Sequence, residues 1–174
     1  MRAIFTIGHS TRPIEEFLRL LQANGVELLI DIRSVPMSRR NPQFNGEMLA
    51  GSLARAGIGY LHLAQLGGLR HPQADSPNGA WRNDSFRGYA DYMQTSEFAA
   101  AIRKLIELGN EKQTAIMCAE AVPWRCHRSL VADALTARGI VVEDIISGAR
   151  RQPHKLTVFA QVEGTRVWYP GLAD

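Results

Sequence analysis

The residue types that could do chemistry are concentrated in one stretch of the chain, residues 118–130. This stretch holds both cysteines of the protein together with an acid, a histidine, two arginines and a tryptophan: Cys118, Glu120, Trp124, Arg125, Cys126, His127 and Arg128. The apolar run before it, residues 114–118, is typical of a short buried strand, and the apolar residues from Leu130 to Leu135 have the spacing of a helix face. We therefore expect a reactive loop between a strand and a helix.

An anion-binding site combined with a reactive thiol is the first chemistry that this loop suggests. If residues 125–128 form the first turn of the helix, the free backbone N–H groups, the helix dipole and the two arginines would attract an anionic group, with Cys126 and His127 in the same turn. The same field would lower the pKa of Cys118 or Cys126 and give a nucleophilic thiolate. However, the spacing from Cys118 to Arg125 is one residue longer than in the phosphate loop of cysteine phosphatases. Cys118 could equally be a small buried residue at a strand end.

A metal site is a second interpretation of the same loop. Cys118, Cys126 and His127, with His9 from the start of the chain, are residue types that bind zinc. The two cysteines lack the close spacing that structural zinc sites show. This spacing disfavours the metal site, and the sequence indicates no particular cofactor.

Acid–base chemistry is a third interpretation. Glu120 and Asp31 are expected at neighbouring strand ends, where two carboxylates, or one beside Arg33, could move a proton at a glycosidic or phosphate ester bond. Alternatively, Asp31 and Arg33 form a structural ion pair that positions the second loop. His9, at the end of the first expected strand, could be a general acid, a phosphate donor or a hydrogen-bonded structural histidine.

Alternating strands and helices must position these residues. The patterns predict strands within residues 2–7, 26–32, 59–63, 114–118 and 140–146, and helices within residues 13–24, 48–57, 86–108 and 130–138. This alternation predicts a single α/β domain over residues 1–174, with an open, mostly parallel sheet of about five strands flanked by helices in a Rossmann-like three-layer arrangement. We expect a core of residues 1–148 and an extension of residues 149–174 that carries a small β-hairpin.

Ligands of such sheets bind beyond the carboxyl ends of the strands, where the strand order reverses. The residues expected just past those ends are His9, Ser10, Asp31, Arg33, Gly67, Gly68, Cys118 and Glu120. All of these should therefore lie along one edge of the sheet. The connection over residues 64–85 is long and rich in glycine and proline, so it is predicted to be a binding loop, a lid or a disordered segment.

The composition sets broad limits on partners. The chain has 174 residues, of which 45% are hydrophobic, and a formal net charge of +3 with a pI near 9.1. This mildly basic balance permits an anionic small molecule or nucleic acid as partner without requiring one. No stretch reaches the ~20 apolar residues of a membrane span, and two cysteines do not make a secreted disulfide framework. We predict a cytoplasmic protein without a membrane partner; the sequence does not indicate its oligomeric state.

The chain also resembles the domain-of-unknown-function family 488, a family of small bacterial and archaeal proteins without an established activity. The matching pieces are Thr6–Ser10, Asp31–Pro36, Leu66–Gly68, Trp81–Phe86 with Tyr89, Cys118–Glu120 and Cys126–Arg128. They cover nearly the whole chain. The resemblance implies a compact α/β domain, and it implies no reaction, cofactor or substrate.

The leading functional hypothesis is a hydrolase-like enzyme for a phosphate-bearing substrate such as a nucleotide or nucleic acid. Arg33, Arg128 and the helix start would hold the anion, and the remaining anion-binding candidates are Ser10, Gly67, Gly68, Arg125, Cys126 and His127. Glu120 and Asp31 would move protons, and Cys118 or His9 would assist. The alternatives are a non-catalytic module that binds nucleotide or nucleic acid, and a metal- or redox-responsive protein that uses its cysteines and histidine.

Overall fold

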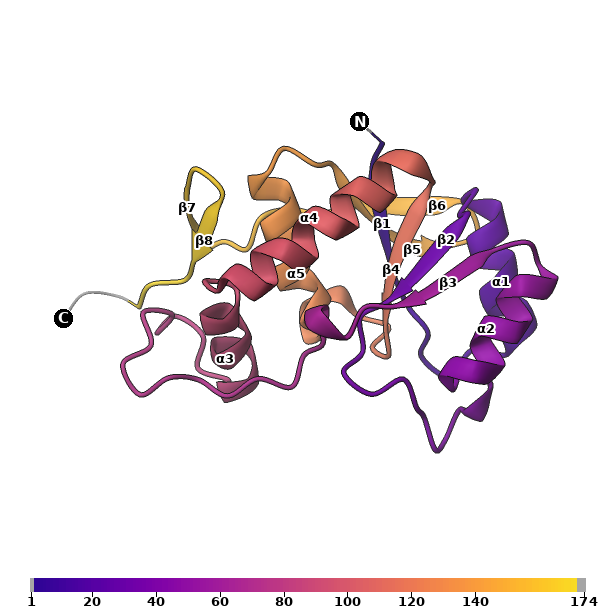
Figure 1. Cartoon of the computed structure of the whole chain (residues 1–174), viewed down its shortest axis with the longest axis horizontal. Helices are drawn as coiled ribbons and strands as arrows, with labels where there is room; N and C mark the ends of the chain where they lie inside the picture. The colour runs from indigo at the N-terminus through magenta and orange to yellow at the C-terminus, as the bar shows by residue number, and fades with distance from the viewer. Residues whose placement is uncertain (1, 172–174) are drawn as a thin grey trace.

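In the computed structural model of the chain, which describes residues 2–171, a six-stranded sheet forms the centre of the fold (Figure 1). The strands are β1 (Ile4–Gly8), β2 (Leu28–Asp31), β3 (Gly59–His62), β4 (Thr114–Cys118), β5 (Val142–Ser147) and β6 (Arg150–Pro153), in the order β3-β2-β4-β1-β5-β6. Strands β1 to β5 run parallel, and β6 is antiparallel to β5. The prediction of an open, mostly parallel α/β sheet is confirmed.

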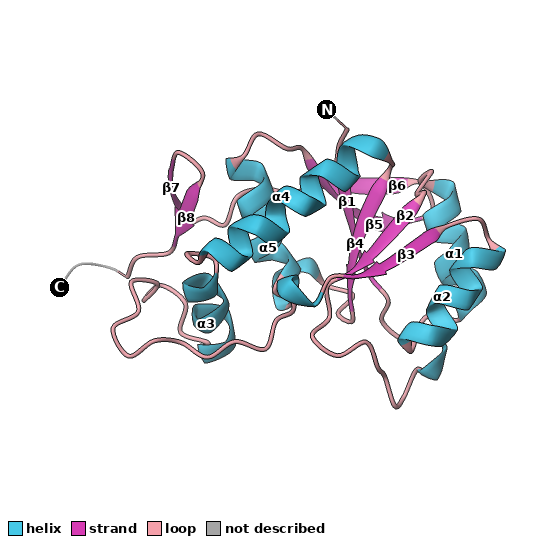
Figure 2. Ribbon diagram, in the orientation of Figure 1, coloured by secondary structure: helices cyan, strands magenta, loops and turns pink. Residues whose placement is uncertain are grey.

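Helices cover both faces of the sheet (Figure 2). They are α1 (Ile14–Ala23), α2 (Gly46–Arg55), α3 (Asp84–Tyr92), α4 (Ser96–Glu111) and α5 (Arg128–Ala137), with short 3-10 turns η1 (Pro42–Phe44), η2 (Ala64–Leu66) and η3 (Pro123–Arg125) between them. Apolar residues of α1 and α2 pack in one core, and those of α3, α4 and α5 in another. Strand side chains alternate between the two cores, with Phe5 and Ile7 in the first and Ile4 in the second. The three-layer arrangement is therefore as predicted.

Strand β4 shows why the reactive loop begins where it does. It pairs with β1 on one side and β2 on the other, and all five of its residues are buried. A parallel strand covered on both faces needs an apolar sequence without alternation, which residues 114–118 provide. Cys118 is the last residue of this central strand, so the chain leaves the sheet at the middle of its carboxyl edge.

Helix α1 illustrates the sequence features that determine where a flanking helix begins, which side it buries and where it ends. It follows Pro13 and carries Glu15 and Glu16 in its first turn, where carboxylates complement the helix dipole. Phe17 is buried on its inner face. The helix ends before Gly25, whose φ of 67° suits a residue without a side chain.

The C-terminal segment adds one strand that the sequence pattern did not predict. Strand β6 is an exposed edge strand, and its polar residues Arg150 and Arg151 resembled a solvated loop rather than a strand. Beyond it, β7 (Gln161–Glu163) and β8 (Arg166–Trp168) form the predicted hairpin. Residues 172–174 of the predicted extension lie outside the described residues.

The connection over residues 64–85 is an anchored loop. The carboxylate of Asp91 in α3 accepts hydrogen bonds from the backbone of Gln73 and from the side chains of Ser76 and Asn78, at 2.6 to 2.8 Å. Asn78 is fully buried. These bonds hold the loop against the C-terminal end of α3.

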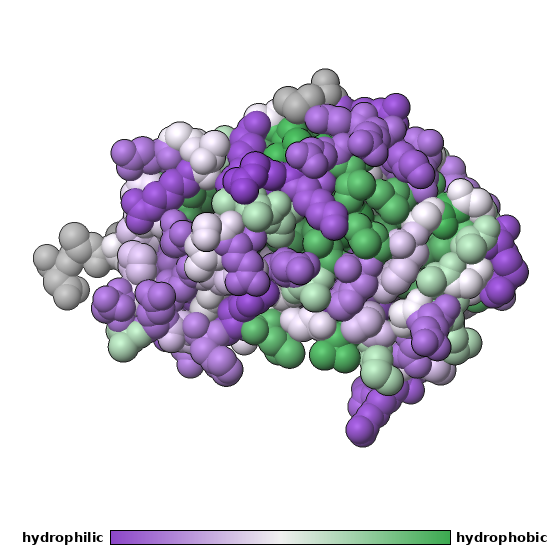
Figure 3. Space-filling model, in the orientation of Figure 1, coloured by the Kyte–Doolittle hydropathy of each residue, from purple (hydrophilic) through white to green (hydrophobic). Residues whose placement is uncertain are grey.

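The hydropathy of one face of the molecule is shown in Figure 3. On the face shown in Figure 3, hydrophilic residues cover much of the periphery, and hydrophobic residues gather over the sheet between α4 and α2. Among residues 2–171, no helix combines the length and the apolar character needed to cross a lipid bilayer.

Candidate functional site

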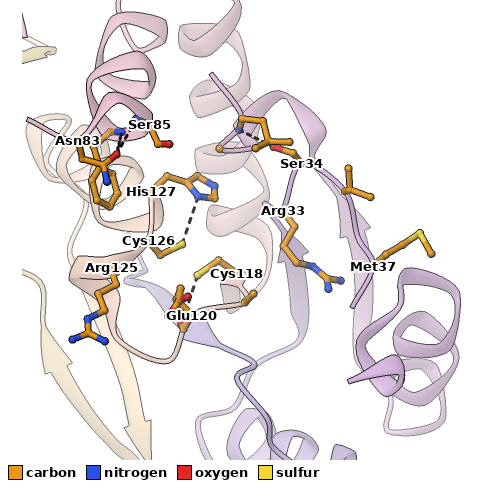
Figure 4. A pocket seen from close by; sticks show the side chains of 15 residues that line it. Arg33, Ser34, Met37, Asn83, Ser85, Cys118, Glu120, Arg125, Cys126 and His127 are labelled. Atoms are coloured by element: carbon orange, nitrogen blue, oxygen red, sulfur yellow. Dashed lines mark hydrogen bonds between the residues drawn. The ribbon is translucent and has the colours of Figure 1, made fainter. Parts of the chain in front are cut away.

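A cavity of about 530 Å³ lies at the carboxyl ends of β2 and β4 (Figure 4). Its walls come from the residues after β2, the turn after η2, the start of α3 and the loop between β4 and α5. The predicted site residues that line it are Arg33, Gly68, Cys118, Glu120, Arg125, Cys126 and His127. The predicted site residues that do not line it are His9, Ser10, Asp31, Gly67 and Arg128.

Cys118 combines a buried position with access to this cavity. Its side chain is 2% exposed, and its sulfur accepts a hydrogen bond of 3.1 Å from Nη1 of Arg128. The sulfur lies 3.7 Å from the carbonyl oxygen of Glu120, which accepts the S–H hydrogen when the thiol is protonated. Burial alone would raise the pKa of the Cys118 thiol. The neighbouring thiol of Cys126 and the charge of Arg128 outweigh burial and bring the pKa of Cys118 below its ordinary value.

Arg128 lies behind the loop rather than in the cavity. Its side chain is 1% exposed, and its guanidinium donates to the carbonyl oxygens of Glu120 at 2.6 Å and Ala121 at 3.1 Å, besides the sulfur of Cys118. None of the ion pairs within residues 2–171 includes Arg128. A buried cation needs a compensating charge, and Cys118 is the hydrogen-bonded group here that can carry one.

The first turn of the helix that follows the loop does not include all of residues 125–128. The anion-binding interpretation depended on such a turn, but Arg125 belongs to η3 and Cys126 has extended backbone angles, φ −132° and ψ 147°. Helix α5 therefore begins at Arg128. Pro123 favours the separate 3-10 turn because it supplies a fixed φ and no N–H group. The condition of one helical turn over residues 125–128 is therefore not met, whereas the helix predicted within residues 130–138 is present.

Gly8 makes the contact between the loop and β1 possible. A Cβ atom at this position would overlap the carbonyl oxygen of Glu120 and would lie 2.6 Å from Nη1 of Arg128. Only glycine lets the loop approach this closely. The end of β1 thus positions the guanidinium that contacts Cys118.

His127 is held as a neutral ring beside the thiols. Its Nε2 donates to the carbonyl oxygen of Ile32 at 2.9 Å, so its Nδ1 is left as an acceptor, 3.5 Å from the sulfur of Cys126. Burial lowers the pKa of His127 to about 4. Gly68 leaves room for this ring, because a Cβ there would lie 2.7 Å from Nδ1. Gly67 similarly leaves room for Ser34.

Cys126 is the protonated member of the thiol pair. Its side chain is 7% exposed, and its sulfur lies 3.5 Å from the backbone nitrogen of Arg128, which donates to it. The neighbouring sulfur of Cys118, together with burial, raises the pKa of Cys126. The two thiols are thus driven apart in acidity, as the coupled groups of reactive sites often are.

Asp31 and Arg33 form the structural ion pair that was one of two interpretations of these residues. Asp31 is fully buried, and its two oxygens accept from Nε and Nη2 of Arg33 at 2.9 and 2.7 Å. The hydroxyl of Tyr60 donates to the same carboxylate at 2.7 Å, and Nη2 of Arg33 also donates to the carbonyl oxygen of Phe44. This bidentate pair holds the segment after β2 in place.

His9 and Ser10 support the site from outside the cavity. His9 is 2% exposed and stacks on Phe44 with a centroid distance of 4.3 Å. Its Nδ1 donates to the carbonyl oxygen of Ser10, and its Nε2 lies 3.5 Å from Nη1 of Arg33. Burial lowers the pKa of His9. These contacts match the hydrogen-bonded structural alternative for this histidine.

Glu120 and Arg125 are the exposed charges of the loop that line the cavity. Neither side chain makes a hydrogen bond or an ion pair within residues 2–171. The backbone N–H groups of residues 119–122 also donate to no protein acceptor within the described residues. The loop can therefore offer a cation, a carboxylate and free amides to a ligand.

Three polar lining residues were not predicted: Ser34, Asn83 and Ser85. The side chain of Asn83 caps α3 by accepting from the backbone of Ser85 at 2.8 Å and of Phe86 at 3.2 Å. An asparagine directly before a helix is a recognisable cap signal. It predicts a helix start, but not that this start reaches the cavity.

The zinc interpretation finds no support in the arrangement of possible ligands. Within residues 2–171, no three histidine, cysteine or acidic side chains stand close enough together to hold a metal ion. Cys126 contacts His127, but the other ring nitrogen of this histidine is bound to a backbone carbonyl.

Comparison with known proteins places the chain in a family. No curated protein and no solved structure matches it. A family model, described as domain of unknown function DUF488, matches residues 13–135. This range includes every residue that lines the cavity. The resemblance carried by the sequence motifs is thereby confirmed, and the chain belongs to the DUF488 family.

Proposed function

We propose that this protein is an enzyme that uses the Cys118 thiolate on a phosphate-bearing substrate, such as a nucleotide or nucleic acid, bound in the cavity at the strand ends. One observation carries the proposal. The buried guanidinium of Arg128 has no carboxylate partner in the described chain and donates to the sulfur of Cys118 at 3.1 Å. A thiolate at this place neutralises the arginine and is also an activated nucleophile.

The free groups of the loop support an anionic substrate. Arg125 lines the cavity without an internal partner, and the backbone N–H groups of residues 119–122 are free to donate. Phosphate oxygens accept several such hydrogen bonds at once. Arg33 and Arg128 were first expected to hold the anion. However, the guanidinium of Arg33 is hydrogen-bonded to Asp31, and that of Arg128 is hydrogen-bonded to the loop carbonyls. Arg125 and the amides are therefore the anion-binding groups of the proposal.

The proposed chemistry has two steps. In the first, the sulfur of Cys118 forms a bond to phosphorus while the bond to the leaving oxygen breaks, and that oxygen takes a proton from solvent. In the second, the carboxylate of Glu120 takes a proton from water, the water oxygen attacks phosphorus, and the sulfur leaves as a thiolate. Glu120 suits the second step because its side chain lines the cavity and makes no internal hydrogen bond.

Turnover assays test this proposal. Reduced protein is incubated with p-nitrophenyl phosphate, bis(p-nitrophenyl) phosphate, nucleotides and short oligonucleotides, and phosphate or chromophore release is measured. We expect turnover by the natural protein and none by Cys118→Ser. Glu120→Gln should lower kcat about a hundredfold, and Arg125→Gln should raise KM about tenfold. Glu107→Gln and Arg103→Gln are matched controls, because both residues are exposed on α4, away from the cavity.

The outcomes separate the alternatives. Turnover that survives in Cys118→Ser contradicts the proposed nucleophile. Ligand binding without turnover across the whole panel, weakened by salt and by Arg125→Gln, would favour a non-catalytic module that binds nucleotide or nucleic acid.

A further inference from the structure

Cys118 and Cys126 meet at one wall of the cavity although they come from different elements. Cys118 ends β4, whereas Cys126 lies between η3 and α5. Arg128 binds both sulfurs, with Nη1 3.1 Å from Cys118 and its backbone nitrogen 3.5 Å from Cys126. Both cysteines line the cavity, and their side chains face the same space in Figure 4. The phosphoryl chemistry proposed above needs only one of them.

We propose that Cys118 and Cys126 form a reversible redox pair that reacts with hydroperoxides. The Cys118 thiolate attacks one oxygen of hydrogen peroxide, the O–O bond breaks, and hydroxide leaves, so that the sulfur becomes a sulfenic acid. The Cys126 sulfur then attacks the Cys118 sulfur, and the sulfenic hydroxyl leaves with the thiol proton as water. The products are one disulfide and water. A thiol reductant restores the dithiol.

The surroundings of each sulfur set the order of these events. Cys118 reacts first because the guanidinium of Arg128 favours its charged form, and the thiolate is the nucleophilic form. Cys126 resolves the sulfenic acid because it remains a thiol beside an acceptor for its proton. That acceptor is Nδ1 of His127, 3.5 Å from the Cys126 sulfur. His127 can pass the proton to the departing hydroxyl group.

The two sulfurs must approach each other to close the bond, because a disulfide brings them to about 2.05 Å. The backbone N–H groups of residues 119–122 make no protein hydrogen bond within the described chain, whereas the carbonyl groups of Ala119, Glu120 and Ala121 accept from Ser10 and Arg128. Peroxide reaches both sulfurs because both cysteines line the cavity. If Cys118 also has the proposed catalytic role, its oxidation stops turnover, and Cys126 keeps the damage reversible.

Intact-mass measurement with thiol titration tests the pair without any substrate. The chain has two cysteines, so an intramolecular disulfide can only join Cys118 to Cys126. Reduced full-length protein is treated with equimolar hydrogen peroxide. We expect the loss of both titratable thiols and of two hydrogen masses per chain, reversed by dithiothreitol. A product that only gains oxygen atoms, or that forms disulfide-linked dimers, contradicts the proposal.

Single-cysteine variants assign the two roles. In Cys126→Ser, peroxide should add oxygen to Cys118, and dithiothreitol should fail to reverse the product once the sulfinic acid has formed. In Cys118→Ser, we expect peroxide to oxidise the Cys126 thiol at least about tenfold more slowly than it oxidises Cys118 in Cys126→Ser. Cys126→Ala, with folding checked by circular dichroism, repeats the first experiment without a hydroxyl group. If Cys126 reacts faster than Cys118, the assignment of roles fails. If turnover is observed but no disulfide forms, only the redox pair is contradicted. If the disulfide forms but no turnover is observed, only the proposed function is contradicted.

Discussion

At the scale of single residues, the two buried arginines of the site are compensated in different ways. Arg33 is paired with the carboxylate of Asp31 through two hydrogen bonds. Arg128 instead donates to two backbone carbonyls and to the sulfur of Cys118. The first pair is internally neutral and structural. The second leaves a positive charge that a thiolate can balance, and this supports the proposal that Cys118 is the reactive position.

Arg128→Lys separates the charge of this arginine from its geometry. Lysine keeps the charge, but its single ammonium cannot reach Cys118, Glu120 and Ala121 together as the planar guanidinium does. We expect the pKa of Cys118 to rise, alkylation by iodoacetamide at neutral pH to slow, and unfolding free energy in urea to fall by about 2 kcal/mol. Arg103→Lys on the exposed face of α4 should change neither quantity. Unchanged alkylation in Arg128→Lys would show that the guanidinium does not activate Cys118.

His127 should make stability depend on pH. Burial lowers its pKa from 6.5 to about 4 in the folded protein, so between these values the unfolded chain binds more protons than the folded one. Stability is therefore fully present above pH 6.5 and falls as the pH drops toward 4. The His127 contribution to this loss is roughly 2 kcal/mol near pH 4.5. This contribution is measured by urea unfolding of the natural protein and of His127→Gln at neutral and acidic pH. The same change of unfolding free energy with pH in both proteins would refute the prediction.

The candidate residues could be found from sequence, but most of their roles could not. The strand ends placed Cys118, Glu120 and Arg125 at the cavity, because position along a parallel strand follows from the apolar pattern. The direction of a long side chain does not follow from that pattern. Arg128 turns back under the loop that precedes it, and His9 packs on Phe44 of a distant segment.

At the scale of elements, the end of β1 and the loop after β4 form one unit. Backbone hydrogen bonds join His9 to Cys118 and Ser10 to Ala119, at 2.9 Å each. Gly8 allows the loop to cross directly over the strand end. The position of Arg128 at Cys118 therefore depends on a strand whose own residues do not line the cavity.

Gly8→Ala tests this dependence. The added methyl group would overlap the backbone of Glu120 and crowd Arg128, and overpacking of this kind costs about 1–3 kcal/mol. We expect a lower midpoint of urea unfolding and slower alkylation of Cys118. Gly51→Ala is the control, because a Cβ at that helical position meets only the end of Arg55 at 3.6 Å, and alanine favours a helix. Equal effects of the two substitutions would contradict the account.

Element prediction succeeded where periodicity is strong and failed where polar residues form structure. The central strands and the amphipathic helices follow from apolar spacing. Strand β6 was missed because an edge strand can consist of polar residues such as Arg150 and Arg151. The helical turn considered for residues 125–128 is absent because the 3-10 turn that begins at Pro123 precedes α5.

At the scale of the whole molecule, the cavity exists only in the folded chain. Its walls combine residues from Arg33 to His127, held by the sheet between two helical layers. The free cation of Arg125 and the free carboxylate of Glu120 stand at this cavity, while the charges of Asp31, Arg33 and Arg128 are committed inside the protein. In the proposed function, the fold thus presents one activated thiol to a ligand.

The measurement that tests this account most directly is the ultraviolet titration of the thiolate in reduced protein, from about pH 5 to about pH 10. The natural protein should show one thiolate that ionises below the ordinary thiol pKa of 9.0, and Cys118→Ser should lack this transition. Cys126→Ser keeps a hydroxyl that can donate to Cys118, so it should retain the transition. The central claim would be contradicted if the low-pKa transition persists in Cys118→Ser and disappears in Cys126→Ser. It would also be contradicted if the natural protein shows no thiolate transition with a midpoint below pH 9.0.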